Sequence, residues 1–358
     1  MVVTKKTRYR TAADLTEAGL IPACDSHVFA ELSGHYAVGV TAQVVATIQN
    51  TVHPAHDPVG RQYLPSAQEL EISAEELADP TGDEAHSPVK GIVHRYPDRV
   101  LLKISKLCAV YCRYCFRREM VGPGQEAFTE DDLEAALGYI ESTPAIWEVI
   151  LTGGDPLVLS ARRLEEVLTR LNRISHVQVV RIHSRVPIAD PERLTDTVCG
   201  VLKNSLKPIY LVVHINHAQE ITPEVESALA RLRAAGCSLL SQSVLLKGVN
   251  DDPLILEQLF RRLIGLYVKP YYLHHPDLAK GTGHFRVSIE RGREIMKALQ
   301  GRLSGICLPR YVLDIPGGFG KVPVEHNYAV LQDDGRYVIE DIDGNSHLYP
   351  PVTEEKRG

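Results

Sequence analysis

Several features that mark other protein classes are missing from this sequence of 358 residues. No apolar stretch is longer than a strand, and the amino-terminal "MVVTKKTRYR" lacks the apolar core of a signal peptide. The net charge of -6 comes from interspersed acids and bases, without the basic stripe that nucleic-acid binding needs. We therefore expect a cytoplasmic protein that binds neither membranes nor nucleic acid.

Cysteine is scarce and unevenly distributed, with seven residues in the chain. An odd and clustered set in a reducing compartment argues against structural disulfides and favours metal or redox ligands. Three of the seven, Cys108, Cys112 and Cys115, belong to the segment "CAVYCRYC", and the other four are scattered singly. This segment is therefore the first candidate for a functional site.

Strand-like and helix-like segments alternate from about residue 99 onward. Six strands are predicted, at residues 99–105, 148–154, 177–185, 208–216, 238–246 and 267–275. They are apolar on both faces, which is typical of a parallel sheet covered by helices. No glycine fingerprint of a dinucleotide fold follows the first strand, so we predict an α/β fold of the partial (β/α)6, TIM-like type. Its chemistry would gather at the carboxyl ends of the strands.

The two ends of the chain differ from this central part. Helical pieces broken by proline and His-rich links predict a helical extension over residues 1–90, followed by the barrel over residues 91–305. The last part, residues 306–358, contains "YAVLQ" and "RYVIE" on either side of Asp333-Asp334-Gly335. A Gly-containing turn between two alternating runs predicts a β-hairpin.

The cysteine segment begins three residues after the first predicted strand, at the expected active-site end of the barrel. Zinc is one alternative, but it normally needs a second C-x-x-C pair or histidines at set spacing, and neither is nearby. Three thiolates suit a 4Fe-4S cluster in which three irons have protein ligands and the fourth is open. An open iron can bind a substrate or a cofactor.

The spacing C-x-x-x-C-x-x-C, with Tyr114 beside the last cysteine, resembles the signature of the radical S-adenosylmethionine (SAM) superfamily. This resemblance implies that the open iron chelates the methionine part of SAM. One electron from a donor then splits the sulfonium to a 5′-deoxyadenosyl radical. The segment "LTGGDPL" resembles the glycine-rich segment of the superfamily, which implies that Gly153, Gly154 and Asp155 line the SAM site.

A second constellation is "LDIPGGFGKVPV", residues 313–324. A phosphate-binding P-loop would need glycine at 315 and a hydroxyl residue at 322, where the chain has Ile315 and Val322. A Gly-rich turn that carries one lysine also suits Schiff-base chemistry, in which a desolvated amine attacks an aldehyde. The remaining alternative for Lys321 is an ordinary surface lysine on a turn.

The cysteine segment, "GGDPL" and "PGGFGK" in this order resemble the lysine 2,3-aminomutase family, from about Arg95 to Pro350. The resemblance implies that Lys321 holds pyridoxal phosphate covalently. It also implies an isomerase that moves the α-amino group of L-lysine to the β carbon, with a 4Fe-4S cluster, SAM and pyridoxal phosphate as cofactors. An electron donor for the cluster and a homo-oligomeric assembly are expected as partners.

The same resemblance implies roles for individual residues. Arg95 and Arg99, with Tyr96 between them, would bind the phosphate of pyridoxal phosphate, since forked guanidinium groups suit a dianion. Arg117 would bind the carboxylate of the substrate. The residues implied to line the SAM site farther along the chain are His214 and Gln242.

The prediction of the substrate depends on two acidic residues. Asp277 and Asp314 match the pair that receives the distal ammonium group in the lysine enzymes. Two carboxylates around a buried cation are chemically sensible, because one alone would compensate its charge poorly. A relative that acts on glutamate would replace these acids, so a diamino acid is favoured over another amino acid. As structural residues, they would instead be a helix cap and a turn residue.

Two departures from the family pattern leave the physiological role open. His274 occupies a position where many lysine aminomutases have tyrosine, and "CRYCFRR" replaces the more usual "CRHCTRR". Both features, with the end of the sequence soon after "LYPP", resemble the short relatives that form (R)-β-lysine for modification of elongation factor P. The stereochemistry of the product and its use are therefore two open alternatives.

Overall fold

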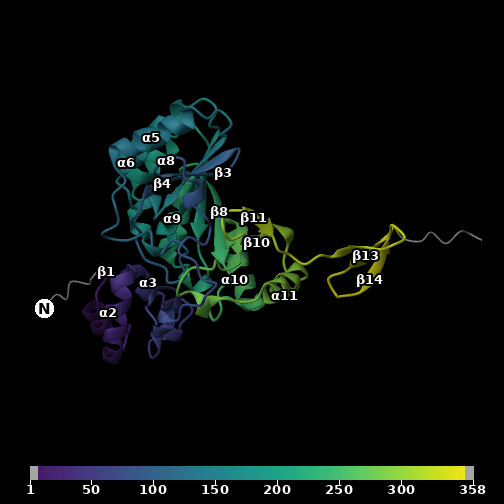
Figure 1. Cartoon of the computed structure of the whole chain (residues 1–358). Helices are drawn as coiled ribbons and strands as arrows, with labels where there is room; N and C mark the ends of the chain where they lie inside the picture. Colours follow the sequence, from purple (N-terminus) through teal and green to yellow (C-terminus); the bar gives the residue numbers. More distant parts are fainter. Residues whose placement is uncertain (1–6, 351–358) are drawn as a thin grey trace, which may run out of the picture.

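The computed structural model describes residues 7–350, and a nine-stranded sheet forms its centre (Figure 1). The strands follow the order β11-β10-β9-β8-β7-β6-β5-β4-β3. Their bounds are Ile92–Tyr96 (β3), Arg99–Ser105 (β4), Glu148–Gly153 (β5), Val179–Ser184 (β6), Ile209–His214 (β7), Ser238–Val244 (β8), Lys269–His274 (β9), Arg310–Asp314 (β10) and Lys321–Pro323 (β11). The two outermost strands, β3 and β11, are not paired with each other, so the barrel is open, as predicted.

The strands from β4 to β10 are paired in parallel, whereas β3 and β11 pair antiparallel at the two edges. All six predicted strands are present, and each observed strand lies within its predicted range. The sequence analysis missed β3, β10 and β11. β3 and β11 are short and only partly buried, so they lack the apolar run that marks the central strands.

Helices connect the parallel strands along the chain. The main ones are Glu130–Glu141 (α5), Ala161–Arg173 (α6), Asp196–Lys203 (α8), Pro223–Ala234 (α9), Pro253–Gly265 (α10) and Ile289–Gln300 (α11), with the short Val186–Ala189 (α7) after β6. Each of the six main helices begins after a Ser, Thr or Asp whose side chain accepts a hydrogen bond from the first turn. This local chemistry explains why the predicted helices form where they do.

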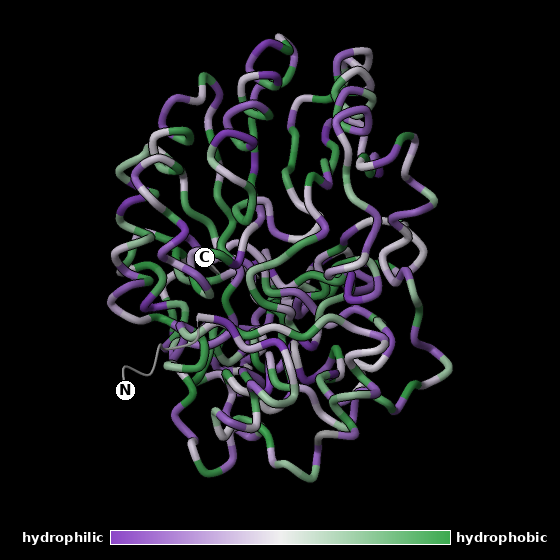
Figure 2. Tube along the Cα trace, turned by 90° about the vertical axis from the view of Figure 1, so that its left-hand side faces the viewer, coloured by the Kyte–Doolittle hydropathy of each residue, from purple (hydrophilic) through white to green (hydrophobic). Residues whose placement is uncertain are grey.

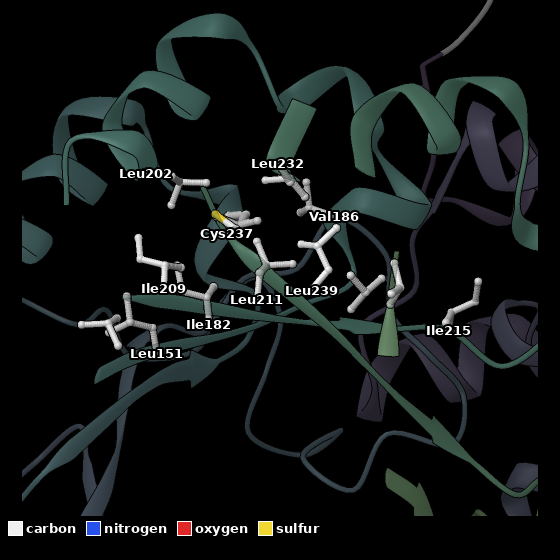
Figure 3. Packing of buried hydrophobic residues seen from close by; sticks show 14 of the residues in the cluster. Leu151, Ile182, Val186, Leu202, Ile209, Leu211, Ile215, Leu232, Cys237 and Leu239 are labelled. Carbon is white, nitrogen blue, oxygen red and sulfur yellow. The ribbon is translucent and has the colours of Figure 1, made fainter. Parts of the chain in front are cut away.

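One large apolar core lies between the sheet and these helices (Figure 3). In Figure 3 the strand residues Ile182, Leu211 and Leu239 lie near the helix residues Leu202 and Leu232. All five are buried, and burial of such a side chain contributes about 1.5–3 kcal/mol. The outer turns of the chain mix hydrophilic and hydrophobic residues, as expected of helices that bury one side (Figure 2). The core therefore gives the open sheet its rigidity.

The amino-terminal extension contains the predicted helices only in part. It forms Ala12–Glu17 (α1), Ser26–His35 (α2), Ala42–Ala46 (α3) and Gly60–Tyr63 (α4), together with the strand pair Arg8–Tyr9 (β1) and Val40–Thr41 (β2). The segment 66–80 reads as a helix but forms only the 3-10 turn Ala67–Leu70. Glu69 of this turn is buried in ion pairs with Arg113 and Arg118, and these tertiary contacts override the local helix preference.

The predicted hairpin near the carboxyl end is present and has a third strand. Ala329–Leu331 (β12), Tyr337–Glu340 (β13) and Ser346–Tyr349 (β14) form an antiparallel sheet of their own, which projects from the body of the molecule in Figure 1. Within residues 7–350, no helix is long and apolar enough to cross a membrane.

Candidate active site

A cavity of about 500 Å³ opens inside the curved sheet. Every residue to which the sequence assigns a site role lines it: Arg95, Tyr96, Arg99, Cys108, Cys112, Cys115, Arg117, Gly153, Gly154, Asp155, His214, Gln242, Asp277, Asp314 and Lys321. These residues come from loops and strand ends that are more than two hundred positions apart in the chain. The structure therefore brings the separate sequence motifs into one space.

The cysteine loop follows β4 and is held by buried ion pairs. Arg113, between two of the cysteines, is fully buried and donates to both carboxylate oxygens of Glu69, with its Nε 3.0 Å from each oxygen. Its backbone N–H donates to the carbonyl of Gln62 at 2.8 Å. Removing one partner of such a pair leaves an uncompensated buried charge. The amino-terminal extension thus determines where the cysteines lie.

The donor set of this loop fits an iron-sulfur cluster. Three thiols of one loop line the same cavity, whereas among residues 7–350 no three Cys, His, Asp or Glu side chains are grouped as for a single metal ion. Burial raises the pKa of Cys115 to about 11 and raises the pKa of Cys108 well above its usual value. Both are therefore thiols in the structure as described, and they would lose their protons when they bind iron.

A network of buried polar side chains holds Tyr114, the aromatic residue of the cysteine loop. Its hydroxyl accepts a hydrogen bond from Nδ2 of Asn216 at 2.7 Å and another from Arg185, and it lies 3.3 Å from Nε2 of His214. Arg185 is buried and pairs with Glu220 at 2.6 Å. The sequence analysis missed Arg185 and Glu220, because neither residue lies in a motif and both act through contacts distant in sequence.

The glycine segment after β5 packs directly on the cysteine loop. Gly153 has φ +111°, and a Cβ there would collide with the carbonyl oxygen of Ser105; a Cβ on Gly154 would collide with that of Leu107. The carboxylate of Asp155 is buried and accepts hydrogen bonds from its surroundings, including the backbone N–H of Arg185 at 2.7 Å. The two glycines are thus required by close backbone approach. The contacts of Asp155 hold the loop in place.

Asp83 lies among several cationic side chains at one side of the cavity. The sequence analysis did not predict a role for it. Its carboxylate pairs with Arg117 at 2.9 Å and with Arg95 at 3.2 Å, and Nζ of Lys103 lies 3.9 Å away. Burial acts to raise the pKa of Asp83, but the charges of Arg117 and Lys103 outweigh it and the pKa is lowered. Three cations face one carboxylate. This excess of positive charge suits anionic ligand groups.

Tyr96 and Arg99 connect this side to the lysine loop. The guanidinium of Arg99 stacks on the ring of Tyr96 at 3.8 Å and pairs with Asp98 at 2.6 Å. The hydroxyl of Tyr96 accepts a hydrogen bond from the backbone N–H of Lys321 at 2.7 Å. Arg95, Arg99 and Lys321 therefore line one side of the cavity, and these residues fit a group with a phosphate and an aldehyde.

Lys321 begins β11, opposite Asp314 at the end of β10. Its Nζ pairs with the Asp314 carboxylate and lies 3.1 Å from Nδ1 of His274. Burial opposes ionisation of Asp314, but the hydrogen bond with His274 and the charge of Lys321 lower its pKa. Burial and the charge of Lys321 lower the pKa of His274 to about 4. The antiparallel strands β10 and β11 thus place Lys321 beside Asp314, which is one of the two acids predicted to bind the substrate.

Asp277 is the second of these acids and differs from Asp314 in its electrostatics. Burial, together with the negative charge of Asp314, raises the pKa of Asp277 to about 7. Lys321 and Arg117 act in the opposite direction without reversing the shift. The two carboxylates therefore interact across the cavity. A cation bound between them would relieve their repulsion.

The glycine turn before Lys321 is wedged against Gly82, which the sequence analysis did not single out. Gly82 has φ +65°, and a Cβ there would lie 2.5 Å from the backbone carbon of Gly317 and the nitrogen of Gly318. Two backbone segments that are remote in sequence thus touch at glycines on both sides. Because of this contact, the turn that carries Lys321 has a defined position relative to Asp83 and the cations around it.

Substitution of Gly82 by alanine is expected to weaken pyridoxal phosphate binding as well as stability. The left-handed backbone alone costs an alanine roughly 1–2 kcal/mol, and the clash also displaces the turn that carries Lys321. Gly19→Ala is the matched control, because Gly19 has φ +68° and nothing within 4 Å of its Cβ position. Thermal unfolding and cofactor titration separate the two effects. Equal cofactor affinity in both variants would contradict a role for Gly82 in positioning.

Comparison with known proteins agrees with this arrangement. Residues 102–257 match the family model of the radical SAM superfamily, and residues 296–356 match the model described as lysine-2,3-aminomutase. The L-lysine 2,3-aminomutase of Fusobacterium nucleatum is 42% identical over 287 residues, covering 80% of this chain and 67% of the relative. A putative L-lysine 2,3-aminomutase of Aquifex aeolicus is 39% identical over 90% of this chain and 86% of its own length.

A relative with a different substrate in its name is also similar. The glutamate 2,3-aminomutase of Clostridioides difficile is 39% identical over 274 residues, covering 76% of this chain and 64% of the relative. Radical SAM proteins carry a 4Fe-4S cluster and SAM, and lysine 2,3-aminomutases use pyridoxal phosphate in addition. With this sheet, these motifs and these relatives, the chain belongs to the lysine 2,3-aminomutase family of radical SAM enzymes.

Proposed function

We propose that the protein interconverts L-lysine and β-lysine by moving an amino group between carbons 2 and 3. One observation carries this proposal: Asp277 and Asp314 line the same cavity as Lys321 and the cysteine loop. The 4Fe-4S cluster with SAM supplies a 5′-deoxyadenosyl radical, and pyridoxal phosphate makes the amino group mobile. The proposed amino migration combines both kinds of chemistry in one cavity, where the protein orients the cofactors and excludes water.

Different residues of the chain would bind the different cofactors. Cys108, Cys112 and Cys115 would hold the cluster, with Gly153 and Gly154 leaving room for SAM beside it. The nearby residues proposed to complete the SAM site are Asp155, His214 and Gln242. The walls of the open barrel would exclude water, which protects a radical from side reactions.

On the opposite side, Arg95, Tyr96 and Arg99 would bind the phosphate of pyridoxal phosphate while the amine of Lys321 binds its aldehyde carbon. The excess of positive charge around Asp83 supports a phosphate there. Asp314 pairs with the ammonium group of Lys321 and would hold this side chain whenever the lysine is not bound to the cofactor.

The electrostatics of the cavity favour L-lysine over L-glutamate. Arg117 offers a cation for the α-carboxylate, and the acids Asp277 and Asp314 offer anions for the distal ammonium group. A glutamate side chain would instead bring a third carboxylate against these two, which is unfavourable in a buried site. The glutamate enzyme among the relatives makes this the alternative to test.

Binding of L-lysine is expected to weaken as the pH falls below about 7. The pKa of Asp277 is about 7 in the empty site, so below that pH this carboxyl is protonated and cannot compensate an ammonium group. The ε-ammonium of lysine stays charged throughout this range, with a pKa of about 10.4. The Kd for L-lysine should therefore rise by up to tenfold for each pH unit below 7, until it reaches the value of a site in which Asp314 alone is charged. Titration of the cofactor-loaded enzyme without reductant measures it.

The Asp277→Asn variant separates this effect from other titrations in the cavity. The charged groups that act on Asp277 are Asp314, Lys321, Arg117 and Asp83, and all of them remain in the variant. Its Kd should be higher than that of the wild type at pH 8 and nearly independent of pH between 6 and 8. A wild-type Kd that does not change over this range would contradict the assignment of Asp277.

The experiment that tests the function is anaerobic incubation of the reconstituted enzyme with SAM, a reductant and L-lysine, followed by chiral chromatography. Formation of β-lysine from L-lysine, with no β-glutamate from L-glutamate, is the expected result. The enantiomer formed also separates the two physiological roles, because (R)-β-lysine is the form used for elongation factor P. No β-lysine from an enzyme with a full cluster and bound pyridoxal phosphate would reject the substrate.

We further propose an external electron donor for the cluster and assembly into a homo-oligomer. The three-stranded sheet β12–β14 supports the second proposal. Leu331, Tyr337 and Tyr349 are paired across its three strands, and all three are exposed, at 61%, 40% and 63%. A contiguous row of exposed apolar and aromatic side chains can mark a protein–protein contact. A second copy of the chain would cover this surface. The molecular mass of the enzyme in solution tests it.

A further inference from the structure

His183 lines the cavity, but it belongs to none of the motifs and has no role in the proposed reaction. It belongs to β6, in the middle of the sheet, and its ring lines the cavity. Its Nε2 is shielded from solvent and has no hydrogen-bond partner within residues 7–350. A buried polar group without a partner costs about 1–3 kcal/mol, so such a group in a binding cavity points to a ligand.

The register of the sheet places His183 beside Arg117. Leu151 pairs with Ile182 across β5 and β6, so the next residues, Thr152 and His183, are neighbours, and both line the cavity. The hydroxyl of Thr152 accepts a hydrogen bond from Nη1 of Arg117 at 3.3 Å. Thr152 therefore places His183 on the same part of the cavity wall as the guanidinium that would bind the substrate carboxylate, and the charge of Arg117 acts on His183.

Some of the N–H donors of Arg117 already form hydrogen bonds within the protein. Its Nε and Nη2 donate to Asp83, and its Nη1 donates to Thr152. A guanidinium has five N–H donors, so only part of this group remains for a ligand. A carboxylate has about four acceptor sites, so one arginine shared with Asp83 leaves some of them without a donor. A second donor beside Arg117 would complete the site.

The ring of His183 is suited to that task in its neutral form. Burial lowers its pKa well below the usual value, and the charges of Arg181, His274, Arg117 and His214 act in the same direction. A neutral imidazole has one N–H donor and one acceptor nitrogen. It can therefore donate to a carboxylate without adding a further positive charge to the group of cations around Asp83.

We propose that His183 binds the α-carboxylate of the amino acid substrate together with Arg117. The proposal rests on the proposed function, since it names a contact to that substrate. The SAM molecule also carries a carboxylate and is the competing source of the same chemistry. The experiment therefore measures both ligands.

The test uses the enzyme loaded with cluster and pyridoxal phosphate, without reductant, so that ligands bind but do not react. The Kd is measured for L-lysine, for 1,5-diaminopentane, which is lysine without its carboxylate, and for SAM. In His183→Ala we expect a rise of about tenfold in the Kd for L-lysine, as one hydrogen bond to a charged group contributes. The Kd values for the diamine and for SAM should stay within twofold of the wild type. His183→Asn, which keeps an N–H donor, should recover part of the loss.

His284→Ala is the matched control, because His284 also has an unpartnered buried nitrogen, Nδ1, but does not line the cavity. It should leave all three Kd values unchanged. Equal losses for lysine and diamine in His183→Ala, a loss for SAM alone, or no loss at all would each overturn the proposal. If the wild type forms no β-lysine but the carboxylate-dependent loss is seen, the proposed reaction fails and the role of His183 stands.

Discussion

Replacement of Lys321 by alanine is expected to abolish β-lysine formation and to remove the visible absorbance of covalently bound pyridoxal phosphate. Among residues 7–350, Lys321 is the only lysine that lines the cavity; Lys103 lies near Asp83 but does not line the cavity. Lys321 is therefore the amine placed to react. The iron content should not change, because the cysteine loop is held by Glu69 and Arg113 and not by Lys321. Absorbance spectra, iron analysis and product chromatography measure the three effects.

Two effects of the substitution must be separated, the loss of the positive charge and the loss of the reactive amine, because Lys321 pairs with the partly buried Asp314. Removing one partner of a fully buried pair can cost about 3–5 kcal/mol of stability, and a smaller loss is expected for this partly exposed pair. Lys321→Arg keeps the positive charge but has no amine that can react with an aldehyde. It should therefore be as inactive as Lys321→Ala while keeping more of the stability. Visible absorbance of a covalent cofactor in either variant would contradict the assignment of Lys321.

Replacement of Cys108 by alanine is expected to abolish cleavage of SAM. A cluster held by three thiolates loses one of its three protein ligands in this variant, and the iron content should fall with it. Pyridoxal phosphate binding should be retained, since Lys321 and the arginines near Asp83 are unchanged. Iron analysis, electron paramagnetic resonance of the reduced protein and the yield of 5′-deoxyadenosine measure the result.

Cys199→Ala is the matched control, because Cys199 is a half-buried cysteine of α8 and does not line the cavity. It should keep both the cluster and SAM cleavage. Full iron content and normal 5′-deoxyadenosine formation in Cys108→Ala would show that the cluster has other ligands. That result would return the cysteine loop to the zinc alternative or to a structural role.

The periodic apolar runs made the central strands predictable. Each parallel strand from β4 to β9 contributes buried apolar side chains to the core and therefore carries an apolar signal in the sequence. The second face is only partly buried in β4, β8 and β9. The edge strands β3 and β11 carry no such signal and became visible only through their pairing with β4 and β10. In the segment 66–80 the sequence favours a helix. The buried ion pairs of Glu69 with Arg113 and Arg118 prevent it.

The site was predictable where residues occur in spaced motifs and hidden where single residues act through distant contacts. The cysteine segment, Gly153-Gly154 and Lys321 each belong to a motif whose spacing has a chemical reason. Asp83 lies 34 residues before Arg117, in a turn that looks ordinary in sequence, and its importance comes only from the cations around it.

By itself, the sequence indicated the class of chemistry, because the cysteine segment, the glycine segment and the lysine turn, in this order, resemble those of a known family, and such motifs can be recognised without a folded structure. It also determined the six parallel strands from β4 to β9, because the apolar pattern of a strand is a local property as well, whereas β3, β10 and β11 were missed. Only the tertiary structure decided which groups share one cavity, how Arg117 is divided between Asp83 and Thr152, and that His183 has a nitrogen without a partner. These are properties of contacts between distant segments, and such contacts form only when the chain has folded around its core.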